Sequence, residues 1–73
     1  MAQERRYAYV YAVIDLDTGM CFMVEDTTNY MDPVEYPDYI EIPEYNEEYL
    51  MKYYNRADGN WYTDPEFTIP LVL

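Results

Sequence analysis

The chain has 73 residues, with 15 Asp and Glu against four Lys and Arg, and a net charge of −11 at pH 7. A charge field of this sign repels nucleic acid and anionic membrane surfaces and attracts basic surfaces. The length allows one domain, residues 1–73, with a core near the lower limit for independent stability. The sequence contains no His, so the commonest general base near neutral pH is missing.

The first predicted element is an N-terminal hairpin over residues 7–25. Apolar and aromatic residues alternate with period two along residues 7–16, as in a β-strand. Residues 17–19 supply turn chemistry, because Gly19 can adopt a positive φ, and residues 20–24 resume a strand pattern. One face of the first strand is expected to carry Tyr7, Tyr9, Tyr11 and Val13.

Alternation along the second strand is expected to separate Phe22 and Val24, on one side, from Cys21 on the other. Cys21 has no His partner, and we interpret it as a small apolar strand residue with no nucleophilic role. A single Cys cannot form an intrachain disulfide, which favours a reducing compartment. The core is expected to come mainly from Val10, Ile14, Leu16, Phe22, Val24, Ile40, Ile42, Leu50 and Trp61.

Residues 26–38 are predicted to form an acidic loop, since no regular period survives there. Residues 39–62 are predicted to contain a short strand over 39–42, a short helix near 46–52 and a second hairpin. Asn46 suits a helix N-cap, and two glutamates follow it in the first turn, where the helix dipole favours them.

The second hairpin is expected to place strands at residues 53–54 and 61–62 on either side of a turn at Asp58 and Gly59. Residues 63–73 form an apolar tail interrupted by two prolines, which packs either on its own sheet or on a neighbouring molecule. The residues through which the tail would contact a neighbour are Leu71 and Leu73. Together these elements predict an α+β fold: a small antiparallel sheet of four or five short strands, with two hairpins and one short helix.

Three carboxylates near the first turn resemble part of a calcium loop, namely Asp15, Asp17 and Asp26. In that loop glycine belongs at position six and oxygen ligands follow it, whereas here Gly19 falls at position five and apolar residues follow. We therefore expect a solvated turn, no metal and no cofactor. Paired carboxylates could also serve glycoside hydrolysis, but a chain of this length scarcely builds the required cleft, and we predict that the protein is not an enzyme.

Two surfaces are candidates for binding a protein partner. The face of Tyr7, Tyr9 and Tyr11 is either a half-buried strand face or an exposed aromatic stripe for a partner or a like subunit in a homo-oligomer. The second surface is acidic, and its carboxylates either keep the protein soluble or mimic the charge density of DNA. The acidic residues are Asp32, Glu35, Asp38, Glu41, Glu44, Glu47 and Glu48. We expect a protein partner with a basic or aromatic-accepting surface, no direct nucleic-acid binding and no membrane binding.

Two stretches of the sequence resemble short modules of tailed-bacteriophage minor structural and tail-fibre proteins. The first runs Tyr9-Val10-Tyr11-Ala12-Val13-Ile14-Asp15 and continues with Thr18-Gly19-Met20-Cys21; the second includes Tyr39-Ile40-Glu41-Ile42-Pro43 and Asp58-Gly59-Asn60-Trp61-Tyr62. The resemblance implies a phage protein with a small β-rich fold and no catalysis. It favours a small virion or tail-associated structural component, located in the host cytoplasm during infection or in the virion. The alternative is an acidic phage inhibitor of a host defence nuclease or DNA-binding protein, similar in behaviour to an anti-CRISPR protein or a DNA mimic.

Overall fold

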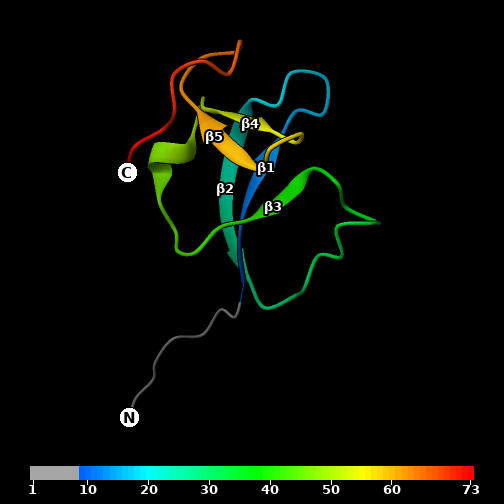
Figure 1. Ribbon diagram of the computed structural model, residues 1–73. Helices are drawn as coiled ribbons and strands as arrows, with labels where there is room; N and C mark the ends of the chain where they lie inside the picture. Colours follow the sequence, from blue (N-terminus) through cyan, green and yellow to red (C-terminus); the bar gives the residue numbers. More distant parts are fainter. Residues whose placement is uncertain (1–8) are drawn as a thin grey trace.

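The computed structural model describes residues 9–73, and these form a mainly β structure (Figure 1). Its five strands are β1 (Tyr9–Ile14), β2 (Cys21–Thr27), β3 (Tyr39–Glu41), β4 (Tyr53–Asn55) and β5 (Asn60–Tyr62). They form two antiparallel sheets, in the orders β2-β1-β3 and β4-β5, and both predicted hairpins are confirmed. β2 extends through Thr27, so the acidic loop is shorter than predicted and covers residues 28–38.

The predicted short helix near residues 46–52 is only a 3₁₀ turn in the described chain, η1 (Glu47–Tyr49), so the α+β class is wrong and the fold is mainly β. Asn46 does cap this turn, since its side-chain oxygen accepts a hydrogen bond from the Glu48 N–H at 2.9 Å. The turn stops after one cycle because Met51 takes a φ of 63° and its N–H donates to the first carbonyl of β2 at 2.8 Å. The chain therefore pairs with β2 at Met51 instead of continuing the helical turn.

Backbone hydrogen bonds join the two sheets into one bent surface. The Cys21 N–H donates to the Lys52 carbonyl at 2.8 Å, and the Tyr54 N–H donates to the Gly19 carbonyl at 2.9 Å. The start of β2 thus pairs with β1 on one edge and with the segment leading into β4 on the other. The β4–β5 hairpin consequently lies against the end of the first hairpin (Figure 1).

The apolar tail packs on its own sheet, one of the two predicted arrangements. The Leu71 N–H donates to the Trp61 carbonyl of β5 at 2.9 Å. The Asp64 carboxylate holds the preceding turn by accepting from two backbone N–H groups at 3.0 and 2.9 Å. As a result Leu71 is half-buried against the core, whereas Leu73 is 62% exposed.

A β-bulge in β2 decides which of its side chains enter the core. The register shifts between Val13, which lies opposite Met23, and Ile14, which lies opposite Cys21, so Phe22 has no partner in β1. An extra residue of this kind interrupts the alternation of side chains along a strand. Cys21 is therefore completely buried and Phe22 is 56% exposed, and the predicted sides of this strand are wrong.

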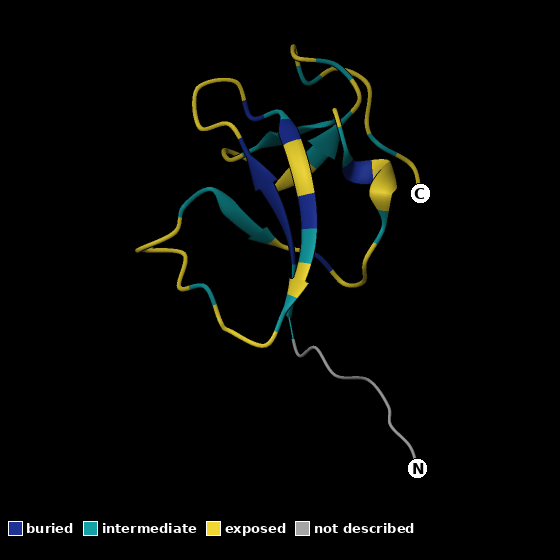
Figure 2. Ribbon diagram, turned by 180° about the vertical axis from the view of Figure 1, so that it is seen from behind, coloured by how far each residue is buried: buried dark blue, intermediate teal, exposed yellow. Residues whose placement is uncertain are grey.

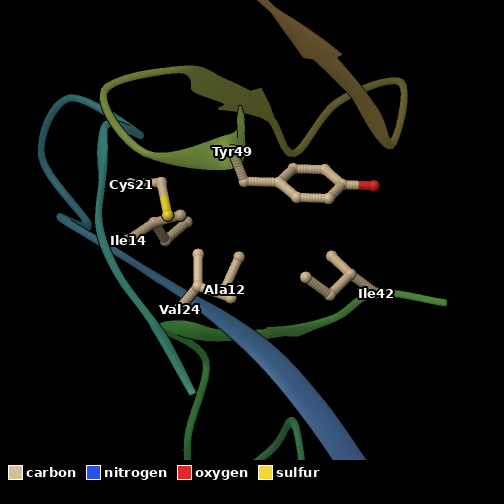
Figure 3. Close-up of a cluster of buried hydrophobic side chains, with 6 residues drawn as sticks. All are labelled: Ala12, Ile14, Cys21, Val24, Ile42 and Tyr49. Carbon is tan, nitrogen blue, oxygen red and sulfur yellow. The ribbon is translucent and has the colours of Figure 1, made fainter. Parts of the chain in front are cut away.

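The core lies between β1, β2, the residue after β3 and η1 (Figure 3). Its buried members are Ala12, Ile14, Cys21, Val24, Ile42 and Tyr49. Four predicted core residues pack against this cluster while remaining partly exposed, namely Val10, Ile40, Leu50 and Trp61. Two predictions are wrong: Leu16 lies in the first turn and is 57% exposed, and Phe22 is turned outward by the bulge.

Candidate functional site

The tyrosines of β1 lie on the face of the three-stranded sheet that is turned away from the core. Tyr11 lies opposite Glu25 in β2 and opposite Glu41 in β3, and residues paired in this way share one face of a sheet. Tyr11 is only 1% exposed, and its hydroxyl accepts a hydrogen bond from the Met31 N–H of the covering loop at 2.9 Å. Figure 2 shows β1 buried along most of its length beside a loop that is mostly exposed. The half-buried alternative therefore describes this face, and the predicted site residue Tyr7 lies outside the described residues.

Five tyrosine rings form a continuous array on this face, in the spatial order Tyr30, Tyr9, Tyr11, Tyr39 and Tyr36. Along that order the ring centroids are 5.5, 6.3, 5.7 and 5.9 Å apart, within the range of favourable aromatic contacts. The rings at the two ends are exposed by 57% for Tyr30 and 42% for Tyr36. The tyrosine array therefore has a buried middle and two ends that reach solvent.

The loop of residues 28–38, which carries two of these rings, is held by hydrogen bonds. The Asp32 carbonyl accepts from the Tyr36 N–H at 2.7 Å, and the Asp32 carboxylate accepts from the Val34 N–H at 2.9 Å. The Arg56 guanidinium, from the turn after β4, donates to the Pro37 carbonyl at 2.7 Å. Contacts over long sequence separations thus place the loop on the sheet.

Sequence reasoning missed three members of the array. Tyr30 and Tyr36 lie in a loop without any period, so no sequence signal marks them as neighbours of β1. Tyr39 could have been found from the register of β3, in which it lies opposite Val13. Glu25 was also missed, because only the pairing of β1 with β2 brings it beside Tyr11.

A small hollow of about 80 Å³ opens beside the array, lined by Tyr11, Tyr30, Met31, Pro33, Tyr39 and Glu41. Glu41 is exposed, and Glu25 is half-buried on the other side of Tyr11. Burial raises the pKa of the Tyr39 hydroxyl, and the negative charges of Glu25 and Asp38 raise it further. The hollow therefore lies in a region of negative potential with aromatic walls.

Of the predicted acidic residues, only Glu41 lines this hollow. The others are distributed over the loop of residues 28–38 and the segment 43–48 that leads into η1. The Glu47 carboxylate has a local partner, since it accepts a hydrogen bond from the Tyr45 hydroxyl at 3.2 Å. Asp38 is half-buried, and the exposed members are Asp32, Glu35, Glu41, Glu44, Glu47 and Glu48.

Leu71 and Leu73 belong to a different surface, beside the second sheet. Together with Tyr49 and Trp61 they help to line a hollow of about 280 Å³. The rings of Tyr49 and Trp61 meet edge to face with centroids 4.9 Å apart, so one wall of this hollow is part of the core. The predicted tail contacts and the tyrosine array are therefore two separate regions.

The remaining titratable groups with shifted pKa values have local causes for them. Burial raises the pKa of the Cys21 thiol. Hydrogen bonds from Tyr62 and Thr68 lower the carboxyl pKa of Asp58 and Asp64, respectively. Among residues 9–73 no Asp, Glu, Asn, Thr, Lys or Arg side chain is buried, and no three Asp, Glu or Cys side chains lie close enough to hold a metal ion.

No helix in the described part of the chain is long and apolar enough to cross a membrane. Comparisons with family models, with curated proteins and with solved structures found no match to this chain. Without a matching protein, inference about function depends on the structure itself, and its candidate binding surface is the tyrosine array with Glu25 and Glu41 beside it.

Proposed function

We propose that this chain is a non-enzymatic binding module that acts by protein–protein contact through the tyrosine array. The observation that carries the proposal is the combination of exposed rings at both ends of the array, Tyr30 and Tyr36, with carboxylates on both strands that flank Tyr11. Tyrosine offers large contact area and a hydrogen-bonding tip at low conformational cost, and it is enriched in protein interfaces. The carboxylates favour a partner whose surface is basic.

The biological setting that we propose is a small virion or tail-associated component of a bacteriophage. Its basis is the resemblance of the sequence to phage tail modules. Such a component would act in the host cytoplasm during assembly or in the virion itself. Contacts made by aromatic side chains suit it, because they depend little on ionic strength and persist when salt screens exposed charges.

A second candidate function is inhibition of a host nuclease or DNA-binding protein by charge mimicry. The observation in its favour is that six of the seven predicted acidic residues are exposed. An inhibitor of this kind would bind through many carboxylates at once, so its affinity would fall steeply as salt rises. The two candidates therefore differ in salt dependence and in the residues on which binding depends.

Affinity capture from host lysate, infected and uninfected, separates the two functions when it is done at about 0.1 M and about 0.5 M salt and read by mass spectrometry. One bait carries Tyr30→Ala and Tyr36→Ala, with Tyr45→Ala as the control because Tyr45 is 48% exposed but lies outside the array. Another bait neutralises three exposed carboxylates that do not line the hollow beside the array, through the substitutions Glu35→Gln, Glu44→Gln and Glu48→Gln.

A virion component should recover phage proteins at both salt concentrations and lose them only with the double tyrosine bait. An inhibitor should recover a basic host protein that is lost at high salt and with the charge-neutralised bait. If neither bait reduces capture of any protein, the tyrosine array and the acidic surface are both excluded as the binding site.

A further inference from the structure

The hollow beside the tyrosine array has the size and shape to receive one compact group. Its volume of about 80 Å³ is far below the roughly 300–1,000 Å³ of sites for drug-sized molecules. Its lining residues include Tyr11 and Tyr39, whose rings meet edge to face with centroids 5.7 Å apart. Tyr11 is only 1% exposed, so the accessible aromatic surface of the hollow comes from Tyr30 and Tyr39.

The charge around the hollow is negative among the described residues. Of residues 9–73, Glu41 is the one charged residue that lines it, and Glu25 shares the same face of the sheet. The ring faces add to this field, because the quadrupole of an aromatic ring is negative over its face. No Lys or Arg of residues 9–73 lines the hollow, and the Arg56 guanidinium is engaged with the Pro37 carbonyl.

We propose that this hollow binds the side-chain ammonium group of a lysine on the protein partner. This inference rests on the proposed function and names the group that the binding surface recognises. A cation over tyrosine faces gains electrostatic energy, and Glu41 adds an ion pair at the rim. Lysine fits better than arginine, because its ammonium is a compact point charge, whereas guanidinium is planar and prefers to stack. Met31 and Pro33 provide apolar surface for the lysine stem.

The test uses n-butylammonium as the probe and follows the tyrosine ring resonances of the full chain by NMR. We expect saturable shifts of the Tyr30 and Tyr39 rings with a dissociation constant on the order of 100 mM, as for a single exposed cation–π contact with an exposed ion pair. 1-Butanol, which has the same stem without the charge, should leave these resonances unchanged. Equal shifts with 1-butanol, or no shift with n-butylammonium, would overturn the proposal. Tighter binding of n-butylguanidinium than of n-butylammonium would also overturn it.

Two single substitutions test whether n-butylammonium binds in the hollow. Glu41→Gln should weaken n-butylammonium binding about threefold, the loss expected when one exposed ion pair is removed. Glu44→Gln makes the same change of charge outside the hollow and should leave the affinity unchanged. Equal loss in both variants would show only a general attraction by net charge and would refute a specific site. Both side chains are exposed, so the folded spectrum should survive each substitution.

A competing occupant is provided by the chain itself, since Arg5 and Arg6 precede the array in the sequence. If these arginines filled the hollow, Arg5→Gln with Arg6→Gln would tighten n-butylammonium binding several-fold, and that result would overturn a partner lysine as the occupant. The lysate capture tests the proposed function independently of the lysine site. If lysate capture depends on Tyr30 and Tyr36 while n-butylammonium does not bind, the array is an interface but the lysine site is wrong.

Discussion

Replacing Gly19 with Ala tests the contact that joins the two sheets. Gly19 has a φ of +81°, and a Cβ atom added there would lie 2.7 Å from the Tyr54 carbonyl oxygen. That separation is shorter than normal carbon–oxygen contact, and the obstacle is backbone, not a flexible side chain. The same backbone segment donates the Tyr54 N–H to the Gly19 carbonyl at 2.9 Å, so it cannot move away without weakening this hydrogen bond.

The magnitude follows from two terms. A non-glycine residue at positive φ costs about 1–2 kcal/mol, and loss of a backbone hydrogen bond costs about 0.5–1.5 kcal/mol. The free energy of unfolding should therefore fall by about 1.5–3.5 kcal/mol, against a total of about 4–11 kcal/mol for a chain of this length. For a domain of this size such a loss lowers Tm by about 6–28 °C.

Gly59→Ala is the matched control. Gly59 also has a positive φ, of +72°, but an added Cβ would meet only the Tyr54 hydroxyl at 3.8 Å. This variant should lose only the conformational term, about 1–2 kcal/mol. Urea denaturation followed by the fluorescence of Trp61, which packs against the rings of Tyr49 and Tyr54, measures both variants. If Gly19→Ala is no less stable than Gly59→Ala, the close approach of the two sheets at Gly19 is refuted.

Three further predictions concern groups away from that contact. Because Cys21 is buried and its thiol pKa is raised by burial, its alkylation by iodoacetamide at pH 8 should be slow in the folded protein and fast in urea, as measured by mass spectrometry. The Asp64 carboxyl pKa lies below its ordinary value of 3.8 because of the hydrogen bond from Thr68, so its charged form stabilises the fold above that pH and this contribution is lost as pH falls further. Asp64→Asn should therefore show a smaller fall in Tm below about pH 4 than the wild type, and an equal fall would contradict the role of this hydrogen bond. Tyr11→Phe removes the acceptor of the Met31 N–H and should lower the free energy of unfolding by about 0.5–1.5 kcal/mol. Protease cleavage in the loop before β3 should become faster, and unchanged cleavage would show that the hydroxyl does not hold the loop.

The parts of the fold that the sequence predicted correctly are those with local causes. Period-two alternation marks β1, and the turn chemistry of Gly19 and of Asp58 with Gly59 marks both hairpins. Asn46 is a cap because its side chain reaches an N–H two residues later, which depends on no distant part of the chain. Such signals need only a few neighbouring residues to be read.

The parts that failed depend on contacts between distant segments. The bulge at Phe22 depends on the pairing of β2 with β1 on one edge and with residues 51–54 on the other. The sequence of β2 alone does not predict it. The same pairing ends η1 after one 3₁₀ turn, where the sequence predicted a short helix near residues 46–52. For the same reason only part of the candidate site was predicted from the sequence. The strand tyrosines were found, whereas the positions of the loop tyrosines depend on how residues 28–38 fold back onto the sheet.

The division of β1 between two faces would allow the proposed binding surface to be separate from the core in so small a chain. Its core face carries Ala12 and Ile14, so the apolar cluster forms without the exposed members of the tyrosine array. Tyr11 links the proposed surface to the stability of the fold, because it is almost completely buried and its hydroxyl holds the covering loop. Variants of Tyr11 should therefore lose stability and binding together, whereas variants of Tyr36 or Glu41 should lose binding alone, because exposed side chains contribute little to folding. A binding surface on the outer face of a core sheet requires this separation, and an array that served only to pack the loop would not produce it.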